Sequence, residues 1–338
     1  MQNFFQKAEE CARRCLLHPY CETVNFLEDR YSCELIAEDS KRVADTVNYK
    51  QQQGSVYIEA IKCVPASAKS CGMPASRPRV TTKDVFYTAN PYLSFSRVAQ
   101  VRPQSHPWMV SIQMNKRHIC TATLISNRAA VTSSSCFAMS ANPARYQAMV
   151  GSTAINGVNP KRQTLDVTSL TVHPGFDPYL SRENDIVIVK FRSAIDFGKS
   201  QGYVAPVCLP TADTVKPGPW SCYTVGWGRI GSFVQVEMLS QLLVPVVKNA
   251  ICNRVDYYNK QVSPTMLCAG HHSATVCQPD IGGPLLCSAF DGVWVLAGVY
   301  SWGEGCARPH KPAVYTNIQS HLPWIRSSLE NPSEKAPR

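Results

Sequence analysis

The chain has 338 residues, of which 44% are hydrophobic and 17% are charged, and its formal net charge is +10. Its 15 cysteines include no C-x-x-C pair of the kind found in zinc sites, so an extracellular disulfide framework is expected rather than a cytosolic or metal-binding protein. No apolar run is long enough to span a membrane, and no block of like charges favours a nucleic-acid partner.

The positive charge lies outside the first 64 residues. Residues 1–64 hold eight Lys or Arg against ten Asp or Glu, whereas residues 65–97 hold five against one and residues 98–338 hold 21 against 13. Such a surface attracts acidic proteins or sulfated polysaccharide, although a merely solvated basic surface is the simpler explanation. Charge alone therefore leaves the partner open.

Residues 1–64 are dense in cysteine and read as a small separate domain. Within them, residues 9–15 favour a helix, because Ala and Arg are good helix formers. Residues 22–27 and 54–61 carry alternating apolar side chains, as strands do. Residues 65–97 are rich in Pro, Ser and Lys and predict an exposed linker.

From residue 98 onward, short β-rich runs are separated by Gly, Pro and Asn turns, which predicts an all-β barrel or sandwich. The runs are WMVSIQM, ATLISN, YQAMVG, DIVIVKF and WVLAGVYSW. Residues 321–329 have helical spacing, and residues 330–338 form a polar tail.

Nine motifs within residues 98–329 resemble those of the trypsin-like serine proteases and follow the family's order. They are HPWMVSIQ, CTATLISNRAAVTSSSC, NDIVIVKF, PVCLP, CYTVGWG, ICN…MLCAG, CQPDIGGPLLC, SWGEGC and KPAVYTNI. The resemblance implies an all-β double barrel with the active site between the two barrels. Within the family, NRVDYYNKQVSPTMLCAGH and GEGCARPHKPAVY are similar to the plasminogen and hepatocyte-growth-factor group.

The first segment has the spacing C-x3-C-x5-C-x11-C followed by a later Cys63, which resembles a PAN (apple-type) domain, a small α+β module that contacts proteins or carbohydrates. We therefore expect a PAN-like domain over 1–64, a linker over 65–97 and a protease-like domain over 98–329. Unlike the plasminogen and growth-factor group, this chain has no kringle between the two domains.

The two resemblances imply a disulfide framework. The implied pairs are Cys11–Cys33, Cys15–Cys21, Cys71–Cys208, Cys120–Cys136, Cys222–Cys287, Cys252–Cys268 and Cys277–Cys306. Cys63 is left over. In the PAN pattern its partner precedes residue 1, so we expect the sequence to begin inside that domain; a free or intermolecular thiol is the alternative.

The resemblance also places the catalytic positions. Ser135 stands where the family has its histidine, Ile281 where it has its nucleophilic serine, and Pro279 where a glycine N–H stabilises the oxyanion. A serine hydroxyl cannot act as a base at neutral pH, isoleucine has no nucleophilic atom, and proline has no N–H. Asp185 keeps the orienting carboxylate, which we expect to be buried and hydrogen-bonded. The expected protein is a pseudo-protease, not an enzyme.

Substrate recognition and activation also depart from the family pattern. Thr275 occupies the floor of the specificity pocket where trypsin-like enzymes carry aspartate, and Ala313 replaces a pocket glycine. Ser301 and Gly303, in the segment that holds the substrate strand, are unchanged. The candidate activation cut after Arg97 is three residues closer to Pro107 than the family pattern has it, so we expect an uncleaved, zymogen-like chain.

These features favour a secreted, non-catalytic protein that binds an extracellular protein receptor or a glycan, heparin-like polymers included. A structural role in matrix assembly is the alternative, which an unpaired Cys63 would favour, and an active endopeptidase with rearranged residues is the remote one. We expect no cofactor, no metal, no nucleic acid and no membrane span.

Overall fold

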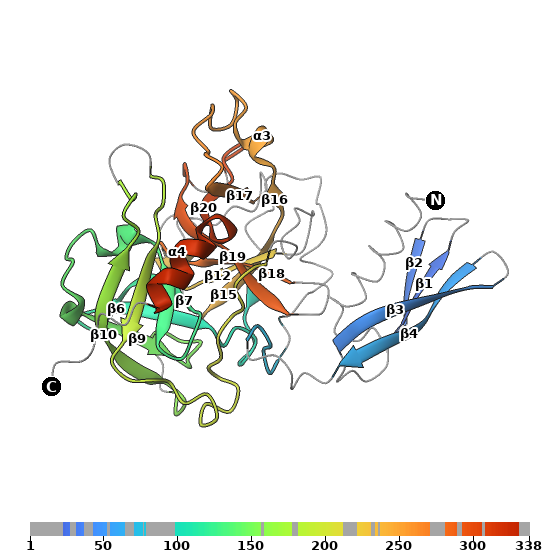
Figure 1. The fold of residues 1–338 in the computed structure, drawn as a ribbon, viewed down its shortest axis with the longest axis horizontal. Helices are drawn as coiled ribbons and strands as arrows, with labels where there is room; N and C mark the ends of the chain where they lie inside the picture. Colours follow the sequence, from blue (N-terminus) through green and yellow to red (C-terminus); the bar gives the residue numbers. More distant parts are fainter. Residues whose placement is uncertain are drawn as a thin grey trace.

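The computed structural model describes most of the segment after residue 98 and part of what precedes it (Figure 1). The described residues are 23–27, 32–36, 43–52 and 55–64 as backbone strands, and 71–76, 78, 99–156, 159–177, 182–211, 222–230, 234–235, 237–270, 281–288, 293–305 and 308–330. The predicted all-β fold is confirmed.

The N-terminal segment contains a four-stranded antiparallel sheet in the order β2-β1-β4-β3. Its strands are β1 (Thr23–Leu27), β2 (Ser32–Ile36), β3 (Val43–Gln52) and β4 (Ser55–Val64). The strands β1 and β4 cover all but the first residue of the two stretches whose alternation predicted strands, 22–27 and 54–61. The expected helix over 9–15, the pairs Cys11–Cys33 and Cys15–Cys21, and the thiol of Cys63 lie outside what the structure describes.

The first half of the protease-like segment closes into a barrel in the order β10-β11-β8-β7-β6-β9. Its strands are β6 (Met109–Met114), β7 (Arg117–Leu124), β8 (Ala129–Thr132), β9 (Tyr146–Val150), β10 (Gln163–Val172) and β11 (Val187–Phe191). Along β10, Leu165, Val167 and Ser169 are buried while the residues between them are exposed, as expected for a strand with one face on the core.

The second half forms an eight-stranded sheet in the order β16-β17-β20-β19-β18-β12-β15-β5. Its strands are β5 (Ala99–Gln100), β12 (Cys222–Gly226), β15 (Ser240–Val244), β16 (Val246–Val247), β17 (Met266–Ala269), β18 (Pro284–Ser288), β19 (Trp294–Trp302) and β20 (Ala313–Asn317). A separate hairpin joins β13 (Arg229–Ile230) and β14 (Val234–Gln235).

Helices are few among the described residues. They are the short 3-10 helices η3 (Ser134–Phe137) and η4 (Pro143–Arg145), the single turn α3 (Asn249–Cys252) and the longer α4 (Ile318–Glu330). The helix α4 contains the stretch for which a helix was expected. It packs Ile318 and Ile325 into a hydrophobic core that also draws on both sheets.

The described residues contain four disulfides, and all four are among the pairings expected from the sequence. They are Cys71–Cys208, Cys120–Cys136, Cys222–Cys287 and Cys252–Cys268. The pair Cys277–Cys306 lies outside the described residues. Cys71–Cys208 fixes the linker to the second sheet, and the next residue, Gly72, exchanges backbone hydrogen bonds with Pro206 and Trp294.

Candidate functional site

The carboxylate of Asp185 is buried at the junction of the two halves and is surrounded by hydroxyl groups. Ser133 Oγ lies 2.8 Å from both carboxylate oxygens, Ser301 Oγ donates at 2.6 Å and Ser135 Oγ at 3.2 Å. The backbone N–H of Ser135 adds a fourth donor at 3.1 Å. Asp185 is 1% exposed. Two serines at the start of η3 and one serine on β19 therefore satisfy one buried carboxylate.

Local structure explains why these serines converge. Ser133 has extended backbone angles and is the N-cap of η3, where its side chain also accepts the N–H of Ser135 at 3.1 Å. The turn of η3 then aims the N–H and hydroxyl of Ser135 at Asp185, which lies two residues before the barrel strand β11. Ser301 approaches from the opposite side on β19, and Thr316 on β20 donates to the backbone carbonyl of Asp185 at 2.8 Å.

Burial raises the pKa of Asp185 above its usual range, because a desolvated carboxylate disfavours its charged form. The hydrogen bonds from Ser301, Ser133 and Ser135 act in the opposite direction, since each of them stabilises the charge. No cation or imidazole hydrogen-bonds to this carboxylate within the described residues. In the described part of the chain, the carboxylate of Asp185 therefore accepts hydrogen bonds from three hydroxyls and one backbone amide.

Ile281 lies just before β18, and its side chain is 39% exposed. Its carbonyl accepts the N–H of Thr121 from the first barrel at 3.2 Å. The next residue, Gly282, has a φ of +82° and donates to Tyr300 O at 3.0 Å. A Cβ on Gly282 would lie 1.8 Å from Thr132 Oγ1, so this position requires glycine. The aliphatic side chain is thus presented by a rigid turn.

The positions expected to form a specificity pocket are only partly described. Ser301 is bonded to Asp185, and Ala313 is buried on β20. A Cβ on Gly303 would lie 3.9 Å from Ala313 Cα, so these two positions are neighbours. Thr275 and Pro279 lie outside the described residues. The structure therefore brings together Ser135, Asp185 and Ser301, and separately Gly303 and Ala313.

Comparison with known families identifies both parts of the chain. A family model described as Trypsin matches residues 96–325, and one described as PAN domain matches residues 2–63. The first match covers well over half of the chain. The chain belongs to the trypsin family.

The trypsin family works with an imidazole held by the buried aspartate, so the histidines of this member matter. Each imidazole that the structure describes has contacts other than Asp185. His106 pairs with Gln241 at 2.7 Å, His118 with Ser111 at 2.7 Å and His310 with Asp256 at 3.2 Å. None of these three interactions involves Asp185.

Two further histidines, His321 and His173, pack against each other near Asn184. His321 on α4 places Nε2 3.0 Å from Asn184 Oδ1 and Nδ1 2.7 Å from Asn317 O, and its ring packs edge-on against His173 at 5.4 Å. Asn184, which directly precedes Asp185, also donates to Gly175 O at 3.0 Å. The sequence indicated neither this anchor nor the role of Ser133. The run of three serines before Cys136 was the one available signal.

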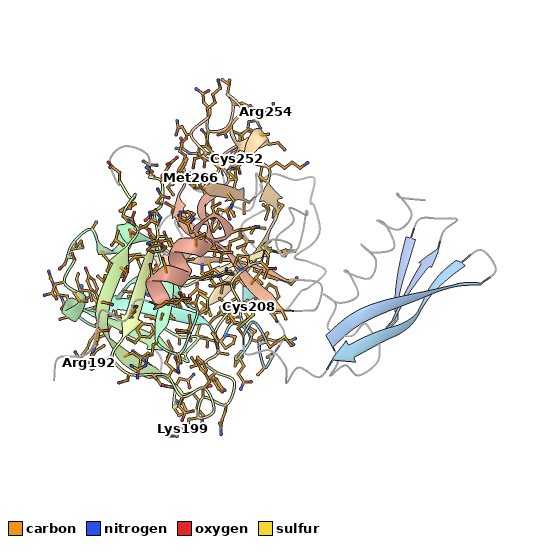
Figure 2. The ribbon with its side chains drawn as sticks, viewed as in Figure 1. Arg192, Lys199, Cys208, Cys252, Arg254 and Met266 are labelled. Atoms are coloured by element: carbon orange, nitrogen blue, oxygen red, sulfur yellow. A yellow bond between two sulfur atoms is a disulfide. The ribbon has the colours of Figure 1, made fainter. Side chains whose placement is uncertain are left out.

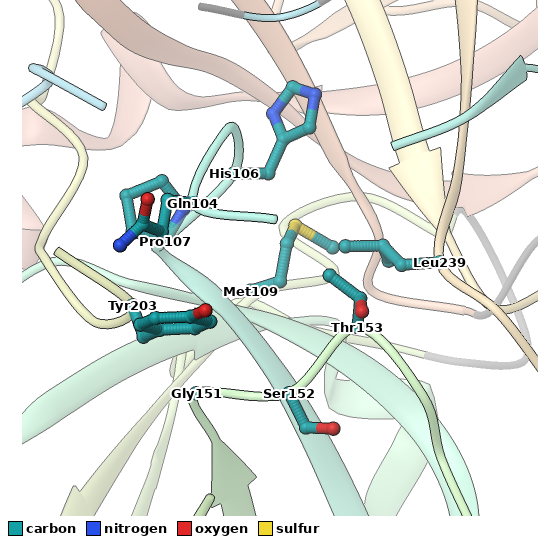
Figure 3. A pocket seen from close by; sticks show the side chains of 9 residues that line it. All are labelled: Gln104, His106, Pro107, Met109, Gly151, Ser152, Thr153, Tyr203 and Leu239. Atoms are coloured by element: carbon teal, nitrogen blue, oxygen red, sulfur yellow. The ribbon is translucent and has the colours of Figure 1, made fainter. Parts of the chain in front are cut away.

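A small cavity of about 10 Å³ has His106 among its lining residues, and its volume is the room that a single water needs. Figure 3 shows Met109 and Leu239 facing it, with the imidazole of His106 turned away from Tyr203. It is too small for a substrate. In the described part of the chain, no cluster of His, Cys, Asp and Glu could hold a metal ion, and no helix is long and apolar enough to cross a membrane.

Proposed function

We propose that this trypsin-family chain is a secreted, non-catalytic protein that acts by binding an extracellular protein or glycan. The observation that carries the proposal is the hydroxyl cage around Asp185, in which Ser133, Ser135 and Ser301 donate to the carboxylate that, in the family's enzymes, accepts the N–H of a catalytic histidine. A hydroxyl has a pKa far above neutrality and cannot take the proton of a nucleophile at pH 7.

The nucleophile position supports the same proposal. Ile281 offers no oxygen, sulfur or nitrogen on its side chain, and the turn that presents it is fixed by Gly282 and Tyr300. Pro279, two residues earlier in the sequence, has no N–H to stabilise an oxyanion. Three requirements for acyl transfer are thus unmet by three different residues.

The remaining features favour binding outside the cell. Four disulfides suit an oxidising compartment, and PAN domains contact proteins or carbohydrates. The motifs similar to the plasminogen and hepatocyte-growth-factor group support a role as a receptor ligand. Assembly into a matrix is the second candidate, because Cys63 has no partner in the expected pairing and could join two chains.

Proteolysis is tested with an active-site-directed serine probe and a panel of arginine, lysine and aromatic fluorogenic peptides. We expect neither labelling nor turnover by the unmodified chain. Stoichiometric labelling, or turnover that the probe abolishes, would refute the proposal. Non-reducing electrophoresis and size-exclusion chromatography separate the two binding roles, because a receptor ligand should run as one chain and a matrix component as a Cys63-linked oligomer.

A further inference from the structure

A positively charged protrusion stands at one end of the second half, built from residues 248–261 and 308–311. Figure 2 shows Arg254 near the end of loops that extend beyond the sheets. The protrusion carries five cationic side chains and one carboxylate, that of Asp256, and Glu304 lies against its base. The cations are Lys248, Arg254, Lys260, Arg308 and Lys311.

Both carboxylates are used inside the protrusion. Asp256 lies between Arg254 Nε at 3.1 Å and His310 Nδ1 at 3.2 Å, and Glu304 pairs with Lys311 Nζ at 3.0 Å. The other three cations are exposed, and none of them forms an ion pair with the residues that the structure describes. They are Lys248, Lys260 and Arg308. Among the described residues, this surface therefore has three positive charges without an acidic partner.

Internal bonds hold these charges on a fixed backbone. Asn253 donates to Val262 O at 2.7 Å and accepts Val262 N–H at 2.9 Å, and Asn249 donates to Met266 O at 2.9 Å. The disulfide Cys252–Cys268 spans the same loop. Tyr258 is buried beneath it with its hydroxyl 2.6 Å from Pro312 O. A surface ordered in this way loses little conformational entropy when it binds.

A flat stack of planar groups lies among the cations. The Tyr257 and His310 rings are parallel within 6° at 4.7 Å, and the Arg254 guanidinium lies 5.9 Å from the Tyr257 centroid. Sugar rings can lie against such planar faces while their anionic groups meet Lys and Arg. Val255 is 83% exposed and Ile251 39%, but single exposed aliphatic side chains are common and form no groove here.

We propose that this protrusion is a binding surface for sulfated polysaccharide, with Lys248, Lys260 and Arg308 as the side chains that meet sulfate groups. The proposal rests on the binding function proposed above and gives it a location and a partner class. A linear polyanion suits the surface better than a folded protein does, because the surface offers spaced, uncompensated charges on a rigid support and no apolar pocket.

The test measures binding of the full chain to a heparin octasaccharide as salt is raised, with an uncharged dextran oligomer as the negative control. The triple variant Lys248→Gln, Lys260→Gln, Arg308→Gln should bind about tenfold or more weakly at 0.15 M salt. Its plot of log affinity against log salt should be shallower by about two to three, since each lost contact removes roughly one released counterion.

The matched control is Lys116→Gln, Arg117→Gln, Arg145→Gln, which removes the same charge from exposed positions of the first barrel. It should keep close to the unmodified affinity and salt slope, as should Val255→Ser. If the triple variant does not fold, its three single substitutions are compared instead, each expected to weaken binding about two- to fourfold.

Equal weakening by the two triple variants would show non-specific attraction and overturn the proposal, and so would unchanged binding by the protrusion variant. Loss of octasaccharide binding by Val255→Ser would also overturn the proposal, because it would show that an apolar contact and not the cations carries the binding. Peptide hydrolysis by the unmodified chain would refute the proposed function without altering any of these binding results, so the two failures are distinguishable.

Discussion

His106 should make the fold unstable in mild acid. Its ring is 5% exposed, in edge contact with Trp108, Tyr223 and Trp294 at 5.9, 6.4 and 6.3 Å. Its Nε2–H donates to Gln241 Oε1, while its buried Nδ1 has no hydrogen-bond partner in the described residues. Burial lowers the pKa of His106 to about 4, and the bond to Gln241 opposes this only partly.

The direction of the effect follows from the unfolded chain, where the pKa of histidine is about 6.5. Above pH 6.5 the ring is neutral in both states, so the full stability is present. Between pH 6.5 and 4 the unfolded chain binds a proton that folded His106 does not, and stability falls. The difference of about 2.5 between the two pKa values, at about 1.4 kcal/mol for each pH unit, gives a total loss of about 3.5 kcal/mol, of which about 3 kcal/mol is reached by pH 4.

The assay is urea unfolding followed by tryptophan fluorescence at several pH values between 7.5 and 4, at constant ionic strength. The unmodified chain and His106→Gln are compared by the change in unfolding free energy across that range, so any pH-independent cost of the substitution cancels. We expect His106→Gln to lose about 3 kcal/mol less than the unmodified chain on acidification.

The control is His173→Gln. Burial, and then the charge of His321, lowers the pKa of His173, but this ring is only partly buried, so removing it should flatten the profile much less. If the unfolding free energy of His106→Gln falls on acidification as much as that of the unmodified chain, His106 is not the group responsible. If His106→Gln and His173→Gln reduce the pH dependence equally, burial does not decide which histidine contributes more.

Two further predictions concern the site. The double variant Ser135→His, Ile281→Ser should stay nearly inert toward peptide substrates. Adding Pro279→Gly should raise its hydrolysis rate by about 10²–10³, because one oxyanion donor contributes roughly that factor. Robust turnover by the double variant would show that the triad positions, not the missing oxyanion donor, limit the rate. Gly282→Ala should lower the free energy of unfolding by about 3 kcal/mol or more, because Gly282 has a φ of +82° and a Cβ there would lie 1.8 Å from Thr132 Oγ1. The control Gly198→Ala should change it by less than about 1 kcal/mol, because the nearest atom to its Cβ would be Asp196 Oδ1 at 3.3 Å. Equal melting temperatures for the two variants would contradict this account.

The sequence predicted the fold well because strand alternation and ordered motifs are local signals. The runs around Met109–Met114 and Trp294–Trp302 became β6 and β19, and four expected disulfides are present. The strands β2 and β3 were not predicted. In β3 (VADTVNYKQQ), the polar half weakens the apolar alternation, and its pairing with β4 comes from tertiary contact.

The sequence predicted that Asp185 is buried and hydrogen-bonded, but it did not identify all of the groups that donate to it. Motifs could place Ser135 and Asp185, whereas the donation from Ser301 depends on how β19 approaches the first barrel, which no spacing records. The anchoring of Asn184 by His321 likewise joins residues 137 positions apart. Such contacts are set by packing between sheets and helices, so local sequence patterns cannot reveal them.

The hydroxyl cage explains how this fold can keep a buried aspartate without a histidine. A buried carboxylate that lost its donor would cost several kcal/mol, because neither water nor a cation would compensate its charge. The Ser135 hydroxyl donates where the family has an imidazole N–H, the backbone N–H of the same residue adds a second bond, and Ser133 and Ser301 supply the rest. Under the proposed non-catalytic function, the serine hydroxyls that stand beside Asp185 in place of an imidazole also stabilise its charge in the protein interior. Asp185 in turn joins the two halves, because its partners come from η3 on one side and from β19 and β20 on the other. The carboxylate is therefore best understood as a structural connection between the halves, and its presence alone is no sign of proteolytic activity.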